Sequence, residues 1–258
     1  MGKLNTNGNA YTIIYASIMV IIVAFLLAFV ASALKPTQDD NVANDKRSQI
    51  LAALNIKKDS VYNVEAKYAE MVKADPVYTK TTEKKSDNGG FDVSKNQLSN
   101  AKLIVKVKNN EELTTKDKEN LEKLERPLYV AETPDGKKYV IPMTGAGLWG
   151  GIWGYVALDD DCETVYGTYF SHESETAGLG ARITEPEFQS SFHGKKLYAG
   201  DDHSKVALSV LKKGKEGDVS PENYVNGITG ATLTSDGVNN MIQQGLSAYS
   251  DILESLKK

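Results

Sequence analysis

Hydroxyl groups are concentrated in one short segment near the end of the chain, 226–237, which reads NGITGATLTSDG. Its glycines allow positive φ and a close approach of a ligand to the backbone. We expect Thr234 or Ser235 to be the N-cap of a following helix, whose first-turn amides and dipole would favour an anion such as phosphate. The segment therefore predicts either a phosphate-binding surface or, as the commoner alternative, an ordinary turn with a helix cap.

Aromatic side chains and glycines are interleaved in a second segment, 145–155, which reads GAGLWGGIWGY. Large flat rings beside exposed backbone suit an aromatic ligand, and Trp149, Trp153 and Tyr155 could supply them. Tryptophans buried in the core on a glycine-rich strand explain the same pattern equally well. The segment by itself leaves both interpretations open.

A third segment, 172–183, reads HESETAGLGARI and begins with acidic residues. The turn at 176–180 offers amides and a threonine hydroxyl that could bind the polar edge of a ring or a phosphate, although a plain loop is the commoner explanation. Glu173 and Glu175 could also be the acid and base of a glycosidase. Nothing else in the sequence indicates a sugar site, so we set that function aside.

The composition excludes several classes of function. The chain has 258 residues and a net charge of −4, from 30 basic and 34 acidic residues, whereas a nucleic-acid partner needs a basic surface. Its one cysteine, Cys162, cannot by itself form an intrachain disulfide, a thiolate zinc site or an iron–sulfur cluster. The three histidines are scattered without metal-ligand spacing. We therefore expect no nucleic-acid partner and no metal site, and any redox chemistry would depend on an organic cofactor or on other chains.

An apolar segment near the N-terminus decides the broad class of protein. Residues 11–34 form a run of 24 residues without a charged side chain, and at about 1.5 Å per residue such a helix crosses a hydrocarbon core of roughly 30 Å. We predict a retained transmembrane helix here, preceded by a short tail at 1–10. A cleaved signal sequence is the alternative, since 31–33 is a stretch of small residues, but the apolar run is longer than a signal sequence needs. The few lysines near its two ends do not decide the orientation.

Apolar periodicity predicts how the rest of the chain is organised. Helical patterns at 47–56 and 61–74 indicate a helical connector or stalk over 35–75. A main domain is expected over 76–258, and the polar stretch at about 79–100 is interpreted as a variable loop within it.

Short strands and a final helix are predicted for this main domain. A turn at 134–136 between two apolar runs is typical of a β-hairpin over 126–143. Further elements are expected as strands at 101–107, 150–158 and 164–170 and as helices at 186–195 and after Ser235. In the last helix apolar residues recur every three or four positions, which indicates packing on a core. We therefore predict an α+β fold, an antiparallel sheet with packed helices, together with one N-terminal transmembrane helix.

The three segments together resemble a known family. The sequence GITGATLTS at 227–235 resembles the flavinylation motif (S/T)-G-A-T-x-T-S of the FMN-binding domain family, and GAGLW at 145–149 and ETAGLG at 175–180 match one branch of that family. With the transmembrane helix and the length, the chain is similar to the C-subunit family of Na⁺-translocating NADH:quinone reductases. The G subunits of the ion-translocating ferredoxin:NAD electron-transport complexes share the motifs but are usually shorter. The resemblance covers the apolar helix and residues 125–250.

The resemblance implies a cofactor and the residues that hold it. The threonine after Gly-Ala in the motif is Thr232, and in the family this residue is joined to FMN through a phosphodiester by a separate flavin transferase that uses FAD. The matching segments imply further cofactor-binding residues, which are Leu148, Trp149, Glu175, Thr176, Gly178, Leu179, Gly180, Gly230, Ala231, Leu233 and Thr234. Where the family often has aspartate, this chain has Asn226. That position is linked to recognition by the transferase, which leaves the efficiency of modification open.

The function implied by the resemblance is electron transfer. The chain would be an anchored flavoprotein subunit that relays electrons within a sodium-pumping complex, with no catalytic acid, base or nucleophile of its own. NADH would bind another subunit, since no strand–GxGxxG–helix unit is present. Expected partners are other membrane subunits, the flavin transferase and membrane lipid, in a bacterial inner membrane with the soluble domain in the periplasm. The alternatives are the related ferredoxin:NAD complex and an anchored module that binds a peptide or lipid on the 145–180 surface without a redox cofactor.

Overall fold

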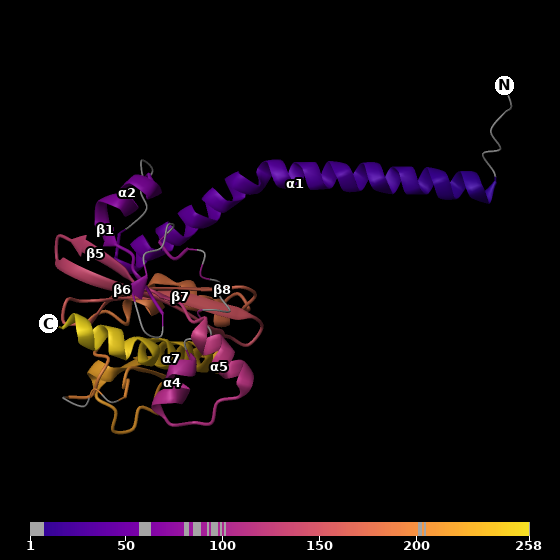
Figure 1. The fold of residues 1–258 in the computed structure, drawn as a ribbon. Helices are drawn as coiled ribbons and strands as arrows, with labels where there is room; N and C mark the ends of the chain where they lie inside the picture. The colour runs from indigo at the N-terminus through magenta and orange to yellow at the C-terminus, as the bar shows by residue number, and fades with distance from the viewer. Residues whose placement is uncertain are drawn as a thin grey trace. The chain divides into compact units, whose positions relative to one another are not determined.

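A computed structural model describes residues 8–56, 63–79, 83–84, 89–91, 93, 98, 100, 102–200, 203 and 205–257. The chain divides into two compact units, Met1–Asp45 and Lys46–Lys258. Figure 1 shows the course of the chain from the long first helix to the final helix. Each unit is described by itself.

The first unit consists of most of helix α1 (Asn9–Ala53). The apolar run at 11–34 lies within this helix, is exposed along its length, and is long and apolar enough to cross a membrane. The polar stretch that follows it does not interrupt the helix, which continues through Pro36. Beside the proline, the ammonium group of Lys35 and the carboxylate of Asp39 form an ion pair at 2.6 Å, one helical turn apart.

The second unit is built on a five-stranded antiparallel sheet with the strand order β1-β5-β6-β7-β8. Its strands are β1 (Val72–Ala74), β5 (Tyr129–Thr133), β6 (Gly136–Ala146), β7 (Gly151–Leu158) and β8 (Val165–His172). The predicted hairpin is confirmed as β5 and β6, which meet at Gly136 with a φ of +97°. The strands predicted at 150–158 and 164–170 are confirmed as β7 and β8. The predicted α+β fold is therefore correct.

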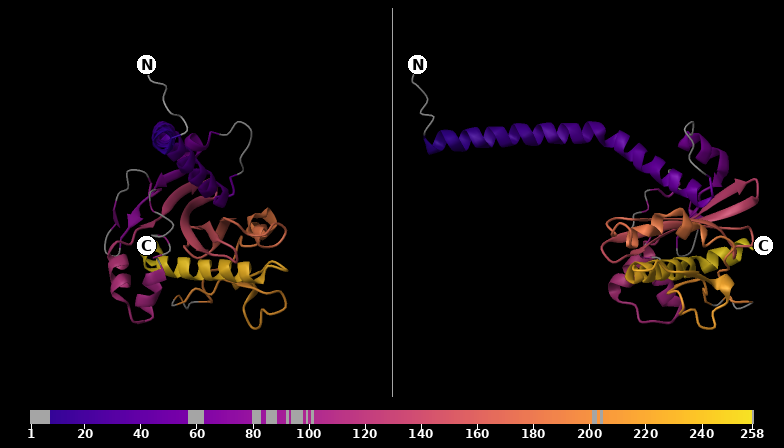
Figure 2. Two further views of the ribbon diagram at one scale, coloured as in Figure 1. Left: turned by 90° about the vertical axis from the view of Figure 1, so that its right-hand side faces the viewer. Right: turned by 180° about the vertical axis from the view of Figure 1, so that it is seen from behind.

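Helices cover both faces of this sheet, as the views in Figures 1 and 2 show. On one face the long helix α7 (Thr232–Leu256) packs on alternate residues of β6, among them Ile141 and Met143. On the other face Val140 and its neighbours contact the last turns of α1, through Ile50, and helix α2 (Val64–Met71). Alternation of side chains along each strand thus creates two separate apolar layers.

The compact unit begins at Lys46 rather than at residue 76. Ile50, Leu51 and Leu54 at the end of α1 are almost completely buried against the sheet. Strand β1, which follows α2 directly, pairs with β5. Much of the segment expected to be a stalk therefore belongs to the folded body, because its apolar side chains cover one face of the sheet.

Smaller elements complete the second unit. They are β2 (Val77–Tyr78), β3 (Glu83–Lys84), β4 (Arg126–Pro127), α4 (Lys102–Lys108), α5 (Thr115–Glu122), η1 (Gly180–Thr184), α6 (Pro186–Ser190), β9 (Ser209–Leu211), η2 (Pro221–Asn223) and β10 (Tyr224–Asn226). Strands β3, β2 and β4 form a small antiparallel sheet, and β9 and β10 form a parallel pair. Most of the variable loop predicted at 79–100 lies outside the described residues.

Three predicted elements differ in the structure. The helical pattern at 61–74 forms helix α2 only as far as Met71, because 72–74 form strand β1. The strand predicted at 101–107 is wrong, since this segment forms helix α4 and buries Leu103 in the core that α7 shares. Seven residues are too few for brief alternation to exclude a helix, and packing against α7 decides the outcome. The helix predicted at 186–195 is shorter than expected, because α6 ends at Ser190.

Candidate functional site

The first turn of α7 differs from the capped turn that the sequence predicts. Helix α7 begins at Thr232, its N-cap is Ala231, and no side chain caps it. Thr234 and Ser235, the two residues predicted as caps, are buried inside the first turn. The Ser235 hydroxyl accepts a hydrogen bond from the amide of Ile228 at 2.9 Å. The prediction of the cap is therefore wrong, because the Thr234 hydroxyl bonds to Glu175 and the Ser235 hydroxyl bonds back to the turn before the helix, and neither caps the helix.

Glu175 connects all three segments that the sequence singled out. Its Oε1 accepts a hydrogen bond from the Trp149 amide at 2.8 Å. Its Oε2 accepts one from the Thr234 hydroxyl at 2.6 Å. The residue is only 7% exposed. One buried carboxylate therefore joins the β6–β7 loop, the segment after β8 and the first turn of α7.

The surroundings of Glu175 keep its carboxylate ionised. Burial acts to raise the pKa of Glu175, but hydrogen bonds from the Thr234 hydroxyl and from the amides of Trp149, Leu148 and Gly150 outweigh it. The net result is a pKa below the ordinary value for glutamate. Three successive amides directed at one carboxylate form a nest for an anion. A fixed negative charge thus lies beneath this part of the surface.

Two glycines make room for this carboxylate. A Cβ atom at Gly147 would lie 2.4 Å from Glu175 Oε1. A Cβ atom at Gly180 would lie 2.4 Å from Glu175 Oε2 and 2.5 Å from the hydroxyl oxygen of Thr234. All three distances are shorter than any van der Waals contact, so a side chain at either position would displace the carboxylate. The glycines in these motifs therefore permit close packing around Glu175.

Further hydrogen bonds hold the β6–β7 loop against the segment after β8. The Ser174 hydroxyl donates to the Trp149 carbonyl at 3.0 Å. The amide of Glu175 donates to Nδ1 of His172 at 3.2 Å, so this ring nitrogen carries no proton. Sequence reasoning missed Ser174, His172 and Gly147 as parts of the site. A serine or histidine in a polar loop carries no signal that it bonds to a distant loop.

Exposed apolar side chains surround the buried carboxylate. Leu148, Trp149, Leu179 and Leu233, here called the apolar surface, are 46%, 66%, 44% and 61% exposed. The backbone amides of Leu148 and Trp149 donate to the Glu175 carboxylate. Leu179 and Leu233 are next in sequence to Gly180 and Thr234, which pack against it or bond to it. In the described part of Lys46–Lys258 only two other large apolar side chains, Val107 and Val219, are comparably exposed. Such a concentration indicates a place where a ligand or a partner binds.

Thr232 is exposed beside the apolar surface. Gly230, two residues earlier, has a φ of +84°, and a Cβ atom there would lie 3.1 Å from the Leu179 side chain. Ala231 is buried and small. The backbone leading to Thr232 thus passes close to Leu179.

Thr176 and Gly178 lie on the exposed turn that leads to Leu179. The carbonyl of Thr176 accepts hydrogen bonds from the amides of Leu179 and Ala181, each at 3.1 Å. Gly178 has a φ of +75°, and a Cβ atom there would meet nothing within 4 Å. Thr176 follows Glu175 in the chain, but the donors to the Glu175 carboxylate come from the β6–β7 loop and from Thr234. Thr176 and Gly178 are exposed and so belong to the outer edge of the site.

The other two aromatic residues of segment 145–155 lie elsewhere. Trp153 donates from Nε1 to Oε1 of Gln49 at 3.2 Å, on the face of the sheet that α1 covers. Tyr155 is buried on the same face, with its ring centre 6.4 Å from that of Tyr129. The interpretation as a core aromatic is therefore right for Tyr155, whereas Trp153 is half-buried beside α1. Trp149 alone of the three belongs to the apolar surface.

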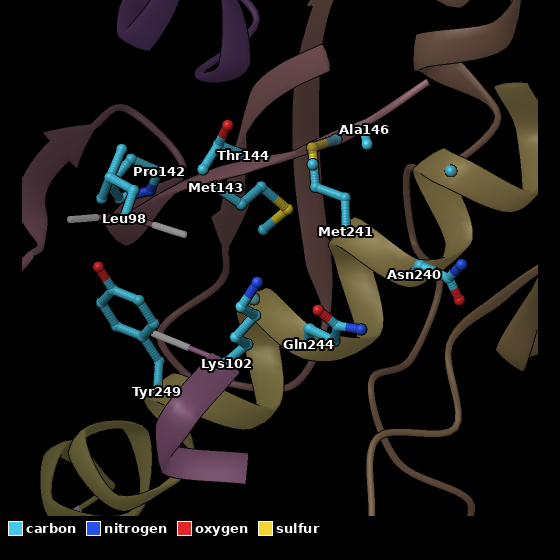
Figure 3. A pocket seen from close by; sticks show the side chains of 13 residues that line it. Leu98, Lys102, Pro142, Met143, Thr144, Ala146, Asn240, Met241, Gln244 and Tyr249 are labelled. Atoms are coloured by element: carbon cyan, nitrogen blue, oxygen red, sulfur yellow. The ribbon is translucent and has the colours of Figure 1, made fainter. Parts of the chain in front are cut away.

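Two hollows are lined by neighbouring parts of the same segments. One, of about 350 Å³, lies between β6 and α7, with Met143 and Met241 at its wall (Figure 3). The other, of about 460 Å³, is lined by Lys213, Asn226 and Thr229, among others. Neither of these two hollows is lined by Thr232 or by the apolar surface. The described residues contain no group of three or more His, Cys, Asp or Glu side chains placed to hold a metal ion.

Comparisons with known proteins show which family the chain resembles. The family model described as FMN-binding domain matches residues 147–247, which contain all three parts of the site. The chain is 32% identical to the C subunit of the Na⁺-translocating NADH-quinone reductase of Haemophilus ducreyi, over 100% of this chain and 98% of that protein. It is 30% identical to the protein of the same name from Pseudomonas aeruginosa, over 98% of each.

A solved structure supports the same relationship. The crystal structure of the C subunit of the Na⁺-translocating NADH-quinone reductase from Parabacteroides distasonis matches with a TM-score of 0.66 and 35% identity, over 85% of this chain and 96% of that one. The similarity to whole relatives extends over the apolar helix and the folded unit alike. The chain belongs to the C-subunit family of the Na⁺-translocating NADH-quinone reductases.

Proposed function

We propose that this chain is a membrane-anchored flavoprotein subunit that carries FMN joined to Thr232 by a phosphodiester and relays electrons within a sodium-pumping NADH:quinone oxidoreductase. The observation that carries this proposal is the convergence of three segments on Glu175, which leaves Thr232 exposed beside an exposed apolar surface. The match to the FMN-binding domain supports FMN as the ligand.

Burial favours Thr232 among the hydroxyl groups of its segment. Thr234 and Ser235 are buried, and their hydroxyls bond to Glu175 and to the Ile228 amide. Thr229 is exposed but lines the second hollow, whose lining includes none of the four residues of the apolar surface. Thr232 is the first residue of α7, where uncapped amides and the helix dipole stabilise a phosphodiester anion. Thr232 is therefore the hydroxyl best placed for the attachment.

The apolar surface supplies contacts for a flat aromatic ring. Trp149 offers a ring face, and Leu148, Leu179 and Leu233 offer apolar edges around it. Gly230 and Ala231 keep the backbone beside Thr232 free of bulk, and the exposed turn at Thr176 and Gly178 lies next to Leu179. Bound FMN would supply the electron-transfer chemistry, and the chain supplies position and electrostatics.

The proposed setting follows from the apolar helix and from the family. The run at 11–34 would cross a bacterial inner membrane once and contact its lipid, with Lys46–Lys258 on the periplasmic side. Other membrane subunits would bind NADH and quinone, and a flavin transferase would attach FMN from FAD. No side chain of this chain needs to act as a general acid, base or nucleophile in this role.

Mass spectrometry tests the attachment directly. The full chain is co-expressed with a flavin transferase and denatured, and the peptide that contains Thr232 is examined for an FMN-phosphoryl group. Thr232→Val should abolish the modification, whereas Thr229→Val, the matched control in the same segment, should leave it unchanged. Colourless, unmodified wild-type protein would contradict the flavoprotein proposal and favour a binding module. Modification that persists in Thr232→Val would place the attachment at another residue.

A further inference from the structure

We infer that Glu175 is a positioning residue whose buried charge both fixes the apolar surface and lowers the midpoint potential of the flavin bound there. This inference rests on the proposed function, since it concerns the flavin attached at Thr232. It assigns to Glu175 an action through the chain and not a direct contact with the cofactor. The inference comes from the contacts of the carboxylate and from the charges around it.

Both carboxylate oxygens of Glu175 are already occupied by donors of the chain. Oε1 faces the Trp149 amide, and Oε2 faces the Thr234 hydroxyl, at 2.8 and 2.6 Å. Only 7% of the residue is exposed. The Glu175 carboxylate therefore has little surface that a ligand could contact. It positions a ligand indirectly, by holding Trp149 and Thr234 in place.

The residues that Glu175 holds are those that carry the apolar surface. Trp149 lies beside Leu148 in the β6–β7 loop, and Thr234 follows Leu233 in the first turn of α7. Without the carboxylate the nest of three amides in that loop would lose its acceptor. Amides that lose their acceptor are unfavourable, so this short loop would rearrange to find other partners. The two halves of the apolar surface therefore depend on one side chain for their relative position.

The charge of Glu175 has no cationic partner. Among the residues that the structure describes, no lysine or arginine forms an ion pair with it, and its donors are amides and a hydroxyl. Dipoles stabilise the carboxylate but leave its net charge in place. In a partly desolvated site this charge opposes the addition of an electron to a neighbouring ring. The flavin should therefore be harder to reduce than it would be over a neutral residue.

Replacement of Glu175 by glutamine separates its effect on the position of the apolar surface from its effect on the midpoint potential. In Glu175→Gln the amide oxygen can still accept from the Trp149 amide, and the amide nitrogen can donate to the Thr234 hydroxyl. The size of the side chain is kept and only the charge is lost. Glu173→Gln is the matched control, because it removes the same charge from the same loop at an exposed position where water screens it.

The first experiment measures the midpoint potential of FMN by spectroelectrochemical titration of the full flavinylated chain in detergent. Absorbance reports only the molecules that carry flavin, so partial loading does not disturb the reading. Glu175→Gln should shift the potential to a more positive value, and Glu173→Gln should leave it within error of the wild type. Glu175→Asp keeps the charge and should give no positive shift. An unchanged potential in Glu175→Gln, or an equal shift in both glutamine variants, would overturn the electrostatic part.

The second experiment needs no flavin. Amide hydrogen exchange of the unmodified full chain is followed at Trp149 and Gly150. Glu175→Ala should make both amides exchange faster, whereas Glu173→Ala should not; equal protection in Glu175→Ala and wild type would overturn the positioning part. If the wild type carries no flavin after co-expression with the transferase, the proposed function fails while this measurement still decides whether Glu175 positions the loop.

Discussion

The hydroxyl of Thr234 donates a 2.6 Å hydrogen bond to the carboxylate of Glu175, although 59 residues separate them in the sequence. This bond is buried, and it links the first turn of α7 to the segment that follows β8. Hydrogen bonds to charged groups are stronger than bonds between neutral groups. The position of α7 relative to the turn at 176–180 therefore depends on this pair.

Removal of the Thr234 hydroxyl should destabilise the protein. Thr234→Val keeps the shape of the side chain but deprives a buried carboxylate of a donor, and we expect the free energy of unfolding to fall by about 1.5–3 kcal/mol. Thr229→Val, at an exposed position in the same segment, should change it by less than about 0.5 kcal/mol. Urea denaturation of the two variants gives the comparison. Equal stabilities would mean that the bond contributes nothing net.

A methyl group at Gly237 should be more harmful than one at Gly245, although both lie in α7. A Cβ atom at Gly237 would approach the Ala146 carbonyl oxygen to 2.4 Å, and backbone cannot move aside as a side chain does. We expect Gly237→Ala to lower the free energy of unfolding by about 1–3 kcal/mol.

At Gly245 the nearest atom would be in the Met143 side chain, at 3.0 Å. Here the usual gain from replacing glycine with alanine in a helix offsets the tight contact, and Gly245→Ala should remain within about 1 kcal/mol of the wild type. Thermal unfolding of both variants distinguishes them. A stabilising effect of Gly237→Ala would contradict the close approach of α7 to the end of β6.

Stability should decrease in acid partly through Glu175. Its pKa is below the ordinary value of 4.5, since the hydrogen bonds outweigh the burial that acts to raise it. A carboxyl whose folded pKa is depressed contributes stability that is fully present above the unfolded pKa and is lost as the pH falls through the folded pKa. The free energy of unfolding should therefore decline below about pH 4.5, and Glu175→Gln should decline less steeply.

The difference between the two pH profiles isolates this residue, because Asp161 and other depressed carboxyl groups contribute equally to both proteins. Denaturation at a series of pH values measures it. Parallel profiles would show that Glu175 titrates alike in the folded and unfolded chain.

Two truncations should behave differently. A chain of residues 46–258 keeps the end of α1 and should fold in water without detergent, because Ile50, Leu51 and Leu54 still cover their face of the sheet. A chain that begins at residue 76 loses these residues together with α2 and β1, and it should aggregate or unfold at lower temperature. Circular dichroism and size-exclusion chromatography compare the two. If the two chains were equally soluble and equally stable to heat, residues 46–75 would be a stalk that the folded domain does not need.

Much of the sheet could be predicted from local sequence. Strands β5 to β8 follow from short alternating runs and from a turn with Gly136 at positive φ, both of which are local properties. Helix α4 could not be predicted, since Leu103 is helical through its packing in the core that α7 shares. The end of α1 likewise shows a helical pattern in sequence, but only the structure places it against the sheet.

Part of the candidate site could likewise be predicted from the sequence, and part could not. The three segments could be recognised from glycine, aromatic and hydroxyl residues, and resemblance to a family selected Thr232. The bonds from Trp149 and Thr234 to Glu175 could not be found, because they join residues far apart in the chain. The N-cap of α7 was also predicted wrongly, since the Thr234 hydroxyl bonds to Glu175 and the Ser235 hydroxyl to the amide of Ile228, and neither caps the helix.

The inward direction of Thr234 and Ser235 has a mechanical consequence. The Thr234 side chain is hydrogen-bonded to Glu175 and the Ser235 side chain to the Ile228 amide just before the helix, while one face of α7 is buried in the core. Thr232 therefore lies at the end of a firmly held helix and not in a flexible loop. A cofactor fixed there could turn only about its own short linkage, so any journey of many ångströms between redox partners would have to be made by the whole Lys46–Lys258 body.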